Sequence, residues 1–324
     1  MTLDLPLVFA ILMGASILAY VVLDGYDLGV GMLMPAAEPS EQETMVASIG
    51  PFWDANETWL VLGVGILVVA FPGAHGIILG ELYLPVAAML IGLMLRGVAF
   101  EFRAKALGWH RELWNWLFWA GSFAASFNQG LMLGRYVTGF QPGFGYWLFA
   151  VLVGASVCGA YVLMGATWLV MKTEGELQEK ARAWTRWGLG WIALGVALVS
   201  VATPMVSATV RERWFDFPKT LGLMILPALT VASGLCILVT LRKSDWKPFA
   251  GAVAIFALAF AGLAYSLFPY VVMDRMTIWQ AAAHASALEF LFAGAAFVLP
   301  FIVAYNIAAQ WIFRGKAKAG LYDH

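Results

Sequence analysis

The stretch from Ser48 to Trp59 reads SIGPFWDANETW, and it opens an apolar run that continues to Phe71. Pro51 suits the first turn of a helix, where its missing N–H leaves no hydrogen bond unmade. Asp54 and Glu57 follow three residues apart, on one face of that helix. Ionisable side chains at membrane depth are costly, so they are candidates for function.

The composition predicts an all-α polytopic membrane protein. The chain has 324 residues, of which 62% are hydrophobic and 12% charged, and its mean hydropathy is +0.80. Soluble domains are about half apolar and about a quarter charged. The formal net charge of −1 argues against a nucleic-acid partner. Membrane lipid is the expected surrounding.

Nine apolar runs are long enough to span a bilayer. They are Pro6–Met34, Phe52–Phe71, Gly76–Phe100, Leu113–Val137, Phe144–Met171, Trp187–Ser207, Thr220–Leu241, Phe249–Val272 and Ala283–Phe313. We expect one membrane domain over residues 1–324. It divides into a four-helix group at 1–138, a second four-helix group at 144–272 and one added helix at 283–313. The polar segment Lys172–Arg186 is expected to be the longest loop and the boundary between the two groups of helices.

The basic residues predict the orientation of the chain. Most Lys and Arg residues fall in loops on the side of the C-terminus, and such loops are usually cytoplasmic. Nine spans then place the N-terminus in the periplasm. No Lys or Arg precedes Arg96, so the first run is expected to be a retained span and not a cleaved signal peptide.

This orientation places six charged residues at one depth, near the cytoplasmic ends of the first three spans. They are Asp24, Asp27, Asp54, Glu57, Arg96 and Glu101. Arg96 is the expected charge partner, and the excess of acids predicts a carboxyl group that exchanges protons readily. Gly25 and Gly29 form a small-xxx-small pair that lets another helix approach closely. For Glu57 and Glu101 the simpler interpretation, helix-end charges that reach the headgroups, is equally compatible with the sequence.

The histidines do not indicate a haem site in this chain. A membrane haem needs axial ligands that face it from helix interiors. His75 and His284 lie at the external ends of spans, His110 lies in a cytoplasmic loop, and His324 is terminal. We therefore expect no metal or haem to be ligated by this chain alone.

Three motifs carry a resemblance to a known family. DGYDLGVG at 24–31, WDANETWL at 53–60 and RGVAFEFR at 96–103 resemble subunit II of the bd-type quinol oxidases, a family that includes a cyanide-insensitive branch. TIWQAA at 277–282 is similar to a weaker, late motif of the same family. The resemblance covers the chain from end to end.

The resemblance implies a terminal oxidase of the bacterial cytoplasmic (inner) membrane that oxidises quinol and reduces dioxygen to water. In that family haem b and haem d are held by the partner, subunit I, in a pseudosymmetric heterodimer. The matching positions imply a hydrophilic path near Asp24, Asp27, Asp54 and Arg96. From their depth in the spans we expect Glu57 and Glu101 to belong to this cytoplasmic proton path as well. Trp53 and Trp59 are expected in packing or an oxygen route.

Some features stay open at this point. Glu57 and Gln280 stand where some relatives carry Gln and Asp, and the later loops are short. These departures leave a structural quinone in this chain and the cyanide sensitivity open. The sequence alone does not decide on a small accessory subunit.

Two other classes compete with an oxidase subunit. A proton-coupled secondary transporter would also use membrane carboxylates, but such proteins carry Gly/Pro-broken helices at corresponding positions of two halves. Pro85, Pro204, Pro227 and Pro300 do not form such a pair. A purely structural anchor would leave the acidic cluster unexplained.

Overall fold

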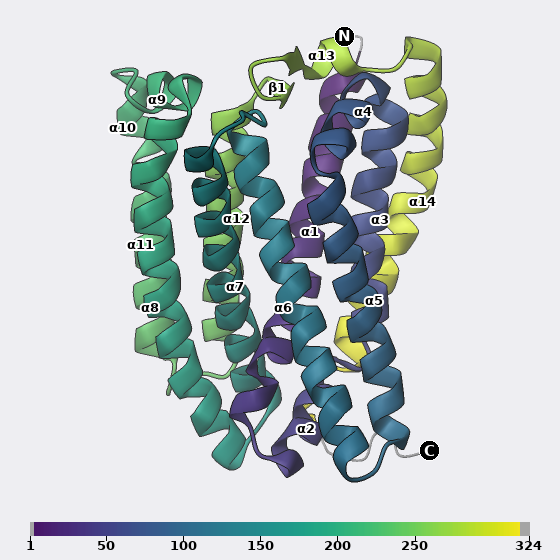
Figure 1. Cartoon of the computed structure of the whole chain (residues 1–324), viewed down its shortest axis with the longest axis vertical. Coiled ribbons are helices and arrows are strands. Elements are labelled where there is room, and N and C mark those ends of the chain that lie inside the picture. The colour runs from purple at the N-terminus through teal and green to yellow at the C-terminus, as the bar shows by residue number, and fades with distance from the viewer. Residues whose placement is uncertain (1–2, 318–324) are drawn as a thin grey trace.

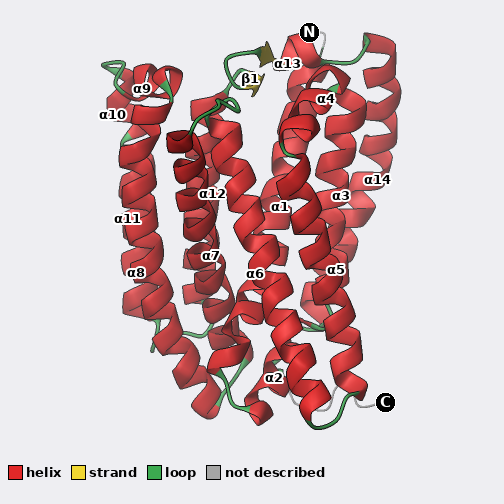
Figure 2. Cartoon of the chain, viewed as in Figure 1, coloured by secondary structure: helices red, strands yellow, loops and turns green. Residues whose placement is uncertain are grey.

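The computed structural model describes residues 3–317, and within them the chain is a bundle of long helices with one small β-hairpin (Figures 1 and 2). The long helices are α1 (Leu5–Leu33), α3 (Trp53–Ala70), α5 (Tyr83–Lys105), α6 (Trp109–Val137), α7 (Phe144–Lys172), α8 (Gly175–Val206), α11 (Ile225–Thr240), α12 (Lys247–Leu267) and α14 (Ala285–Ile312). The short elements are η1 (Met34–Ala36), α2 (Pro39–Ile49), α4 (Pro72–Glu81), α9 (Ala208–Trp214), α10 (Lys219–Leu223), β1 (Tyr270–Val272), β2 (Met276–Thr277) and α13 (Ile278–Ala281).

The prediction of an all-α polytopic membrane protein is confirmed. Within the described residues, eight helices are long and apolar enough to cross a membrane. The other predicted span lies in α6, whose 29 residues include Asn115, Asn128 and Gln129 and are less apolar. In Figure 1, α6 runs the height of the bundle beside α5 and α7. The count of nine and the orientation of the termini stay predictions.

Several expected boundaries are wrong. The segment Lys172–Arg186 is not a loop, because α7 ends at Lys172 and α8 begins at Gly175, so its charged residues lie on the first turns of a 32-residue helix. Gly175 adopts a φ of +65°, which a residue without Cβ tolerates and which turns the chain sharply here.

One expected span is divided, and another ends early. The run Gly76–Phe100 falls into α4 and α5. The run Thr220–Leu241 is found as one candidate span, Thr220–Thr240, in which α10 and α11 meet at Met224. The run Phe249–Val272 leaves the helix at Leu267 and ends in β1, which pairs antiparallel with β2. Hydropathy alone does not separate a short surface helix or strand from the span it adjoins.

Helix α1 lies at the centre of the bundle and crosses α7 at very short range. A Cβ at Gly25 would lie 2.8 Å from the Tyr161 ring, and one at Gly29 would clash with the carbonyl oxygen of Tyr161. Gly165 of α7 faces Gly29 in the same way. Small residues on both helices allow this approach. Inside a bilayer the hydrophobic effect does not drive helices together, so close packing and its dispersion contacts hold them.

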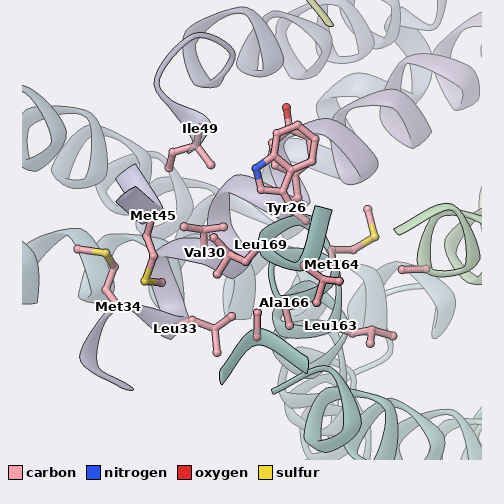
Figure 3. Packing of buried hydrophobic residues seen from close by; sticks show 14 of the residues in the cluster. Tyr26, Val30, Leu33, Met34, Met45, Ile49, Leu163, Met164, Ala166 and Leu169 are labelled. Carbon is pink, nitrogen blue, oxygen red and sulfur yellow. The ribbon is translucent and has the colours of Figure 1, made fainter. Parts of the chain in front are cut away.

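The largest apolar cluster surrounds this crossing. Figure 3 shows Val30 and Leu33 of α1 close to Leu169 of α7, with Met45 and Ile49 of α2 nearby. The Tyr26 ring stacks on Trp168, with ring centroids 3.9 Å apart. Because α7 also packs against both α6 and α8, α7 joins the two predicted four-helix groups, whose separation stays a prediction.

The α1–α7 crossing predicts a strong effect of one methyl group. Gly29→Ala should lower the free energy of unfolding by about 1–3 kcal/mol, because its Cβ meets backbone that cannot move easily. Gly65→Ala on α3 is the matched control, since a Cβ there meets nothing within 4 Å. Thermal unfolding of the two variants in detergent measures the difference. Equal midpoints for both variants would show that the helices do not touch at Gly29.

Candidate functional site

Three helices bring buried polar residues to one level of the bundle. Asp24 lies nine residues before the end of α1, and Arg96 lies nine residues before the end of α5. At 1.5 Å per residue each is roughly 14 Å from that end of its helix. Glu57 is in the second turn of α3.

Arg96 is the centre of this cluster. Its side chain is 2% exposed, and its Nη1 lies 2.7 Å from Oδ1 of Asp24, which is fully buried. Its Nη2 donates to Oε1 of Glu57, whose side chain is 28% exposed. One guanidinium thus pairs with carboxylates from two other helices. A buried charge needs such partners, because desolvation alone costs several kcal/mol per ion.

Asp27 is buried beside the same cluster but is held differently. Oδ2 of Asp27 accepts a hydrogen bond of 2.7 Å from Nδ2 of Asn56 on α3. The same nitrogen lies 2.9 Å from the Tyr26 hydroxyl and 3.1 Å from the carbonyl oxygen of Leu23. Asn56 therefore ties α3 to α1 and orients the Asp27 carboxyl group.

A second polar group lies one turn away along α1. The Tyr20 hydroxyl accepts a hydrogen bond of 2.7 Å from Gln129 of α6, and Oε1 of Gln129 accepts one of 2.5 Å from the hydroxyl of Tyr161. Tyr20 is four residues before Asp24 and thus on the same helix face. These three side chains extend the polar cluster across α6 and α7.

The other two predicted acids lie outside the buried cluster. Asp54 and Glu101 are exposed on the outer surface of α3 and α5. Within residues 3–317 neither carboxylate makes a hydrogen bond or an ion pair. The structure thus joins Asp24, Asp27, Glu57 and Arg96 and leaves Asp54 and Glu101 at the surface.

The two tryptophans of the motif lie on different sides of α3. The Trp53 ring packs against Phe100 at a centroid distance of 5.0 Å, with the Arg96 guanidinium 6.0 Å from its centre. Nε1 of Trp59 donates to Oδ1 of Asn306 on α14 at 3.4 Å. Trp53 thus covers Arg96, and Trp59 contacts the last helix.

Sequence reasoning did not select Asn56, Tyr26, Tyr20, Gln129 or Tyr161. Asn56 lies inside the motif at 53–60 and is 1% exposed. Its sequence signal was a polar amide two residues after Asp54, at the start of an apolar run. For Gln129 the local signal was a polar amide inside a predicted span. For Tyr161 the sequence holds no local signal, because its partner comes from another helix.

The histidines that the structure describes lie at helix ends, and His324 lies outside the described residues. No group of three or more His, Cys, Asp or Glu residues that could hold a metal ion is found in the described part of the chain. His75, His110 and His284 lie at or near the starts of three different helices. A haem between helix interiors would need ligands deeper in the bundle.

The buried ion pairs predict a large effect of neutralising Arg96. Arg96→Gln should destabilise the folded chain by about 3–5 kcal/mol, because it leaves Asp24 buried without its cation. Arg275→Gln, which removes an exposed pair with Glu81, should cost less than about 1 kcal/mol. Yield and thermal midpoint of both variants provide the comparison. An Arg96 variant as stable as the Arg275 variant would contradict the pairing.

Comparisons with known proteins agree on one family for this chain. A family model described as cytochrome bd terminal oxidase subunit II matches residues 5–313. The chain is 28% identical to cytochrome bd ubiquinol oxidase subunit 2 of Bacillus subtilis (strain 168), over 95% of each chain. It is 26% identical to cytochrome bd-I ubiquinol oxidase subunit 2 of Escherichia coli (strain K12), over 96% of this chain and 95% of that one.

A solved structure shows the same fold. A chain of the bd oxidase from Geobacillus thermodenitrificans matches with a TM-score of 0.75 at 17% identity, over 96% of this chain and 99% of that one. The family model, the two relatives and this likeness agree from one end of the chain to the other. This multi-pass protein of the inner membrane therefore belongs to the cytochrome bd terminal oxidase subunit II family.

Proposed function

We propose that this chain is the subunit of a bd-type quinol oxidase that supplies a proton path from the cytoplasm and supports the haem-bearing partner. The family assignment supports membership of a terminal quinol oxidase complex. The observation that carries the proton path is the set of three carboxyl groups (Asp24, Asp27 and Glu57) around the single Arg96 guanidinium.

The charge balance of this cluster supports proton transfer. Arg96 forms ion pairs with Asp24 and Glu57, whereas among the described residues Asp27 has no cation within ion-pair distance. With one cation for three carboxyl groups, a proton held among them lowers the cost of burying the excess negative charge. Such a proton can be passed on.

Glu57 is the member through which the path reaches the surface. Its side chain is partly exposed, whereas Asp24 and Asp27 are fully buried. Asp54 lies three residues earlier on α3, and both it and Glu101 are exposed. We assign Asp54 and Glu101 to the entrance of the path and Glu57 to the step between this entrance and the buried cluster.

The oxidation of quinol and the reduction of dioxygen belong to the partner in this proposal. We assign haem b and haem d to subunit I, because His75, His110 and His284 of this chain lie at or near helix starts and not in helix interiors. Trp59 lies between α3 and α14, where it serves packing or an oxygen route. A structural quinone and a small accessory subunit would be further components of the complex.

The first test replaces the partly exposed acid. In the assembled oxidase, Glu57→Gln should lower oxygen-reduction turnover by about tenfold or more, because it removes one proton-accepting group from the path. Glu112→Gln, an exposed acid in the first turn of α6, is the control and should keep the original turnover. Haem content must be equal in both complexes. Equal turnover with full haem content would contradict the proton path.

A second test addresses the entrance. Asp54→Asn should slow turnover several-fold at high pH, where protons are scarce and a surface acid that collects them matters most. At low pH the variant and the original complex should approach each other. Turnover measured across the pH range decides the point. Identical profiles would remove Asp54 from the path and leave the buried cluster unaffected.

A further inference from the structure

Asp27 differs from the other buried acids in what holds it. Asp24 and Glu57 share Arg96, whereas the single hydrogen bond to Asp27 within the described residues comes from the Asn56 amide. Its other oxygen, Oδ1, has no hydrogen-bond partner there. The orientation of this fully buried carboxyl group therefore depends on one donor.

Asn56 is itself fixed by its surroundings. Three acceptors surround Nδ2 within 3.1 Å: the Leu23 carbonyl, the Tyr26 hydroxyl and Oδ2 of Asp27. Nδ2 is the end of the amide that points at Asp27, because an oxygen in that position would face the Leu23 carbonyl oxygen, which can only accept a hydrogen bond. An amide donor at 1% exposure can neither rotate freely nor exchange its partners for bulk water.

Tyr26, which accepts a hydrogen bond from the Asn56 amide, is itself held in place by two further contacts. Its ring stacks on Trp168 with an interplanar angle of 11°. Its hydroxyl also accepts a hydrogen bond of 3.3 Å from Nε2 of Gln310 on α14. Trp168 of α7 and Gln310 of α14 thus fix the position of Tyr26. Tyr26 and Leu23 in turn accept hydrogen bonds from the Asn56 amide, which donates to Asp27. Preorganised support of this kind keeps a reacting group in one geometry.

We propose that Asn56 is the positioning residue for Asp27, and that Asp27 exchanges its proton with the Arg96 cluster only while this amide holds its carboxyl group. The inference deepens the proposed function and rests on it. Asn56 neither gains nor loses a proton. Among the described residues, the charged and titratable groups that interact electrostatically with Asp27 are Asp24 and Tyr26 on α1, Glu57 on α3 and Arg96 on α5.

The variants needed are close in size to the original side chains. Asn56→Leu removes the donor with little change in volume, and Asn56→Gln keeps an amide. Asn128→Leu on α6 makes the same chemical change at a half-buried amide that bonds only to the carbonyl of Ala124 in its own helix. Asp27→Asn identifies the infrared carboxyl signal of Asp27 by its loss.

The experiment uses the assembled oxidase purified from native membranes. Haem content, oxygen-reduction turnover and infrared difference spectra in the carboxyl C=O region are recorded for each variant. We expect Asn56→Leu to shift the Asp27 band and to lower turnover about tenfold, as for one lost hydrogen bond to an acidic group. Asn56→Gln should recover most of that turnover, and Asn128→Leu should change neither the band nor the turnover.

The outcomes separate the inference from the function on which it rests. Full turnover in Asp27→Asn would overturn the proton role of Asp27, even if Asn56→Leu shifts the band. A second outcome would overturn the positioning role alone. In it, Asp27→Asn lowers turnover, but the Asn56→Leu complex has the same Asp27 infrared band and the same turnover as the Asn128→Leu complex. If the Asn56→Leu complex does not assemble with haem, the Asn56→Gln complex is measured instead. An Asp27 infrared band that is not shifted, together with a turnover as low as in Asp27→Asn, would then contradict the proposal.

Discussion

The buried guanidinium of Arg96 is the constraint on which the rest of the structure depends. It comes from α5 and pairs with Asp24 of α1 and with Glu57 of α3, so three helices must meet at one depth. A cation taken out of water is tolerated only with such partners. On another face of α1, the close crossing with α7 at Gly29 and Gly165 brings the backbones of the two helices together. Packing and charge are thus satisfied by the same helix, on two faces.

Much of this arrangement could be predicted from the sequence, because its causes are local. The apolar runs predict the membrane helices, and the basic loops predict a common level for Asp24, Glu57 and Arg96, which the structure brings together. The motifs at 24–31, 53–60 and 96–103 indicate the family that the comparisons show. Lys172–Arg186 failed as a loop because charged residues at the start of a long helix look the same as a polar connection when only composition is counted.

The finer parts of the site depend on contacts between distant residues. Gln129 meets Tyr20 and Tyr161 through the packing of α6 with α1 and α7. No spacing rule within one helix contains that information. Asp54 and Glu101 share the motifs and the level of the buried acids but point to the outer surface of α3 and α5. The division between buried and exposed acids is therefore a result of helix rotation, which hydropathy alone does not define.

The central claim is that oxygen reduction in the partner draws its protons through the carboxyl groups around Arg96. The most direct measurement is the rate of proton uptake when the fully reduced complex is mixed with oxygen, followed with a pH-indicating dye alongside the haem absorption. We expect the double variant Asp24→Asn, Asp27→Asn to bind oxygen at the original rate and to take up protons at least about tenfold more slowly, with haem oxidation delayed to the same extent. Proton uptake at the original rate in a complex with full haem content would contradict the account.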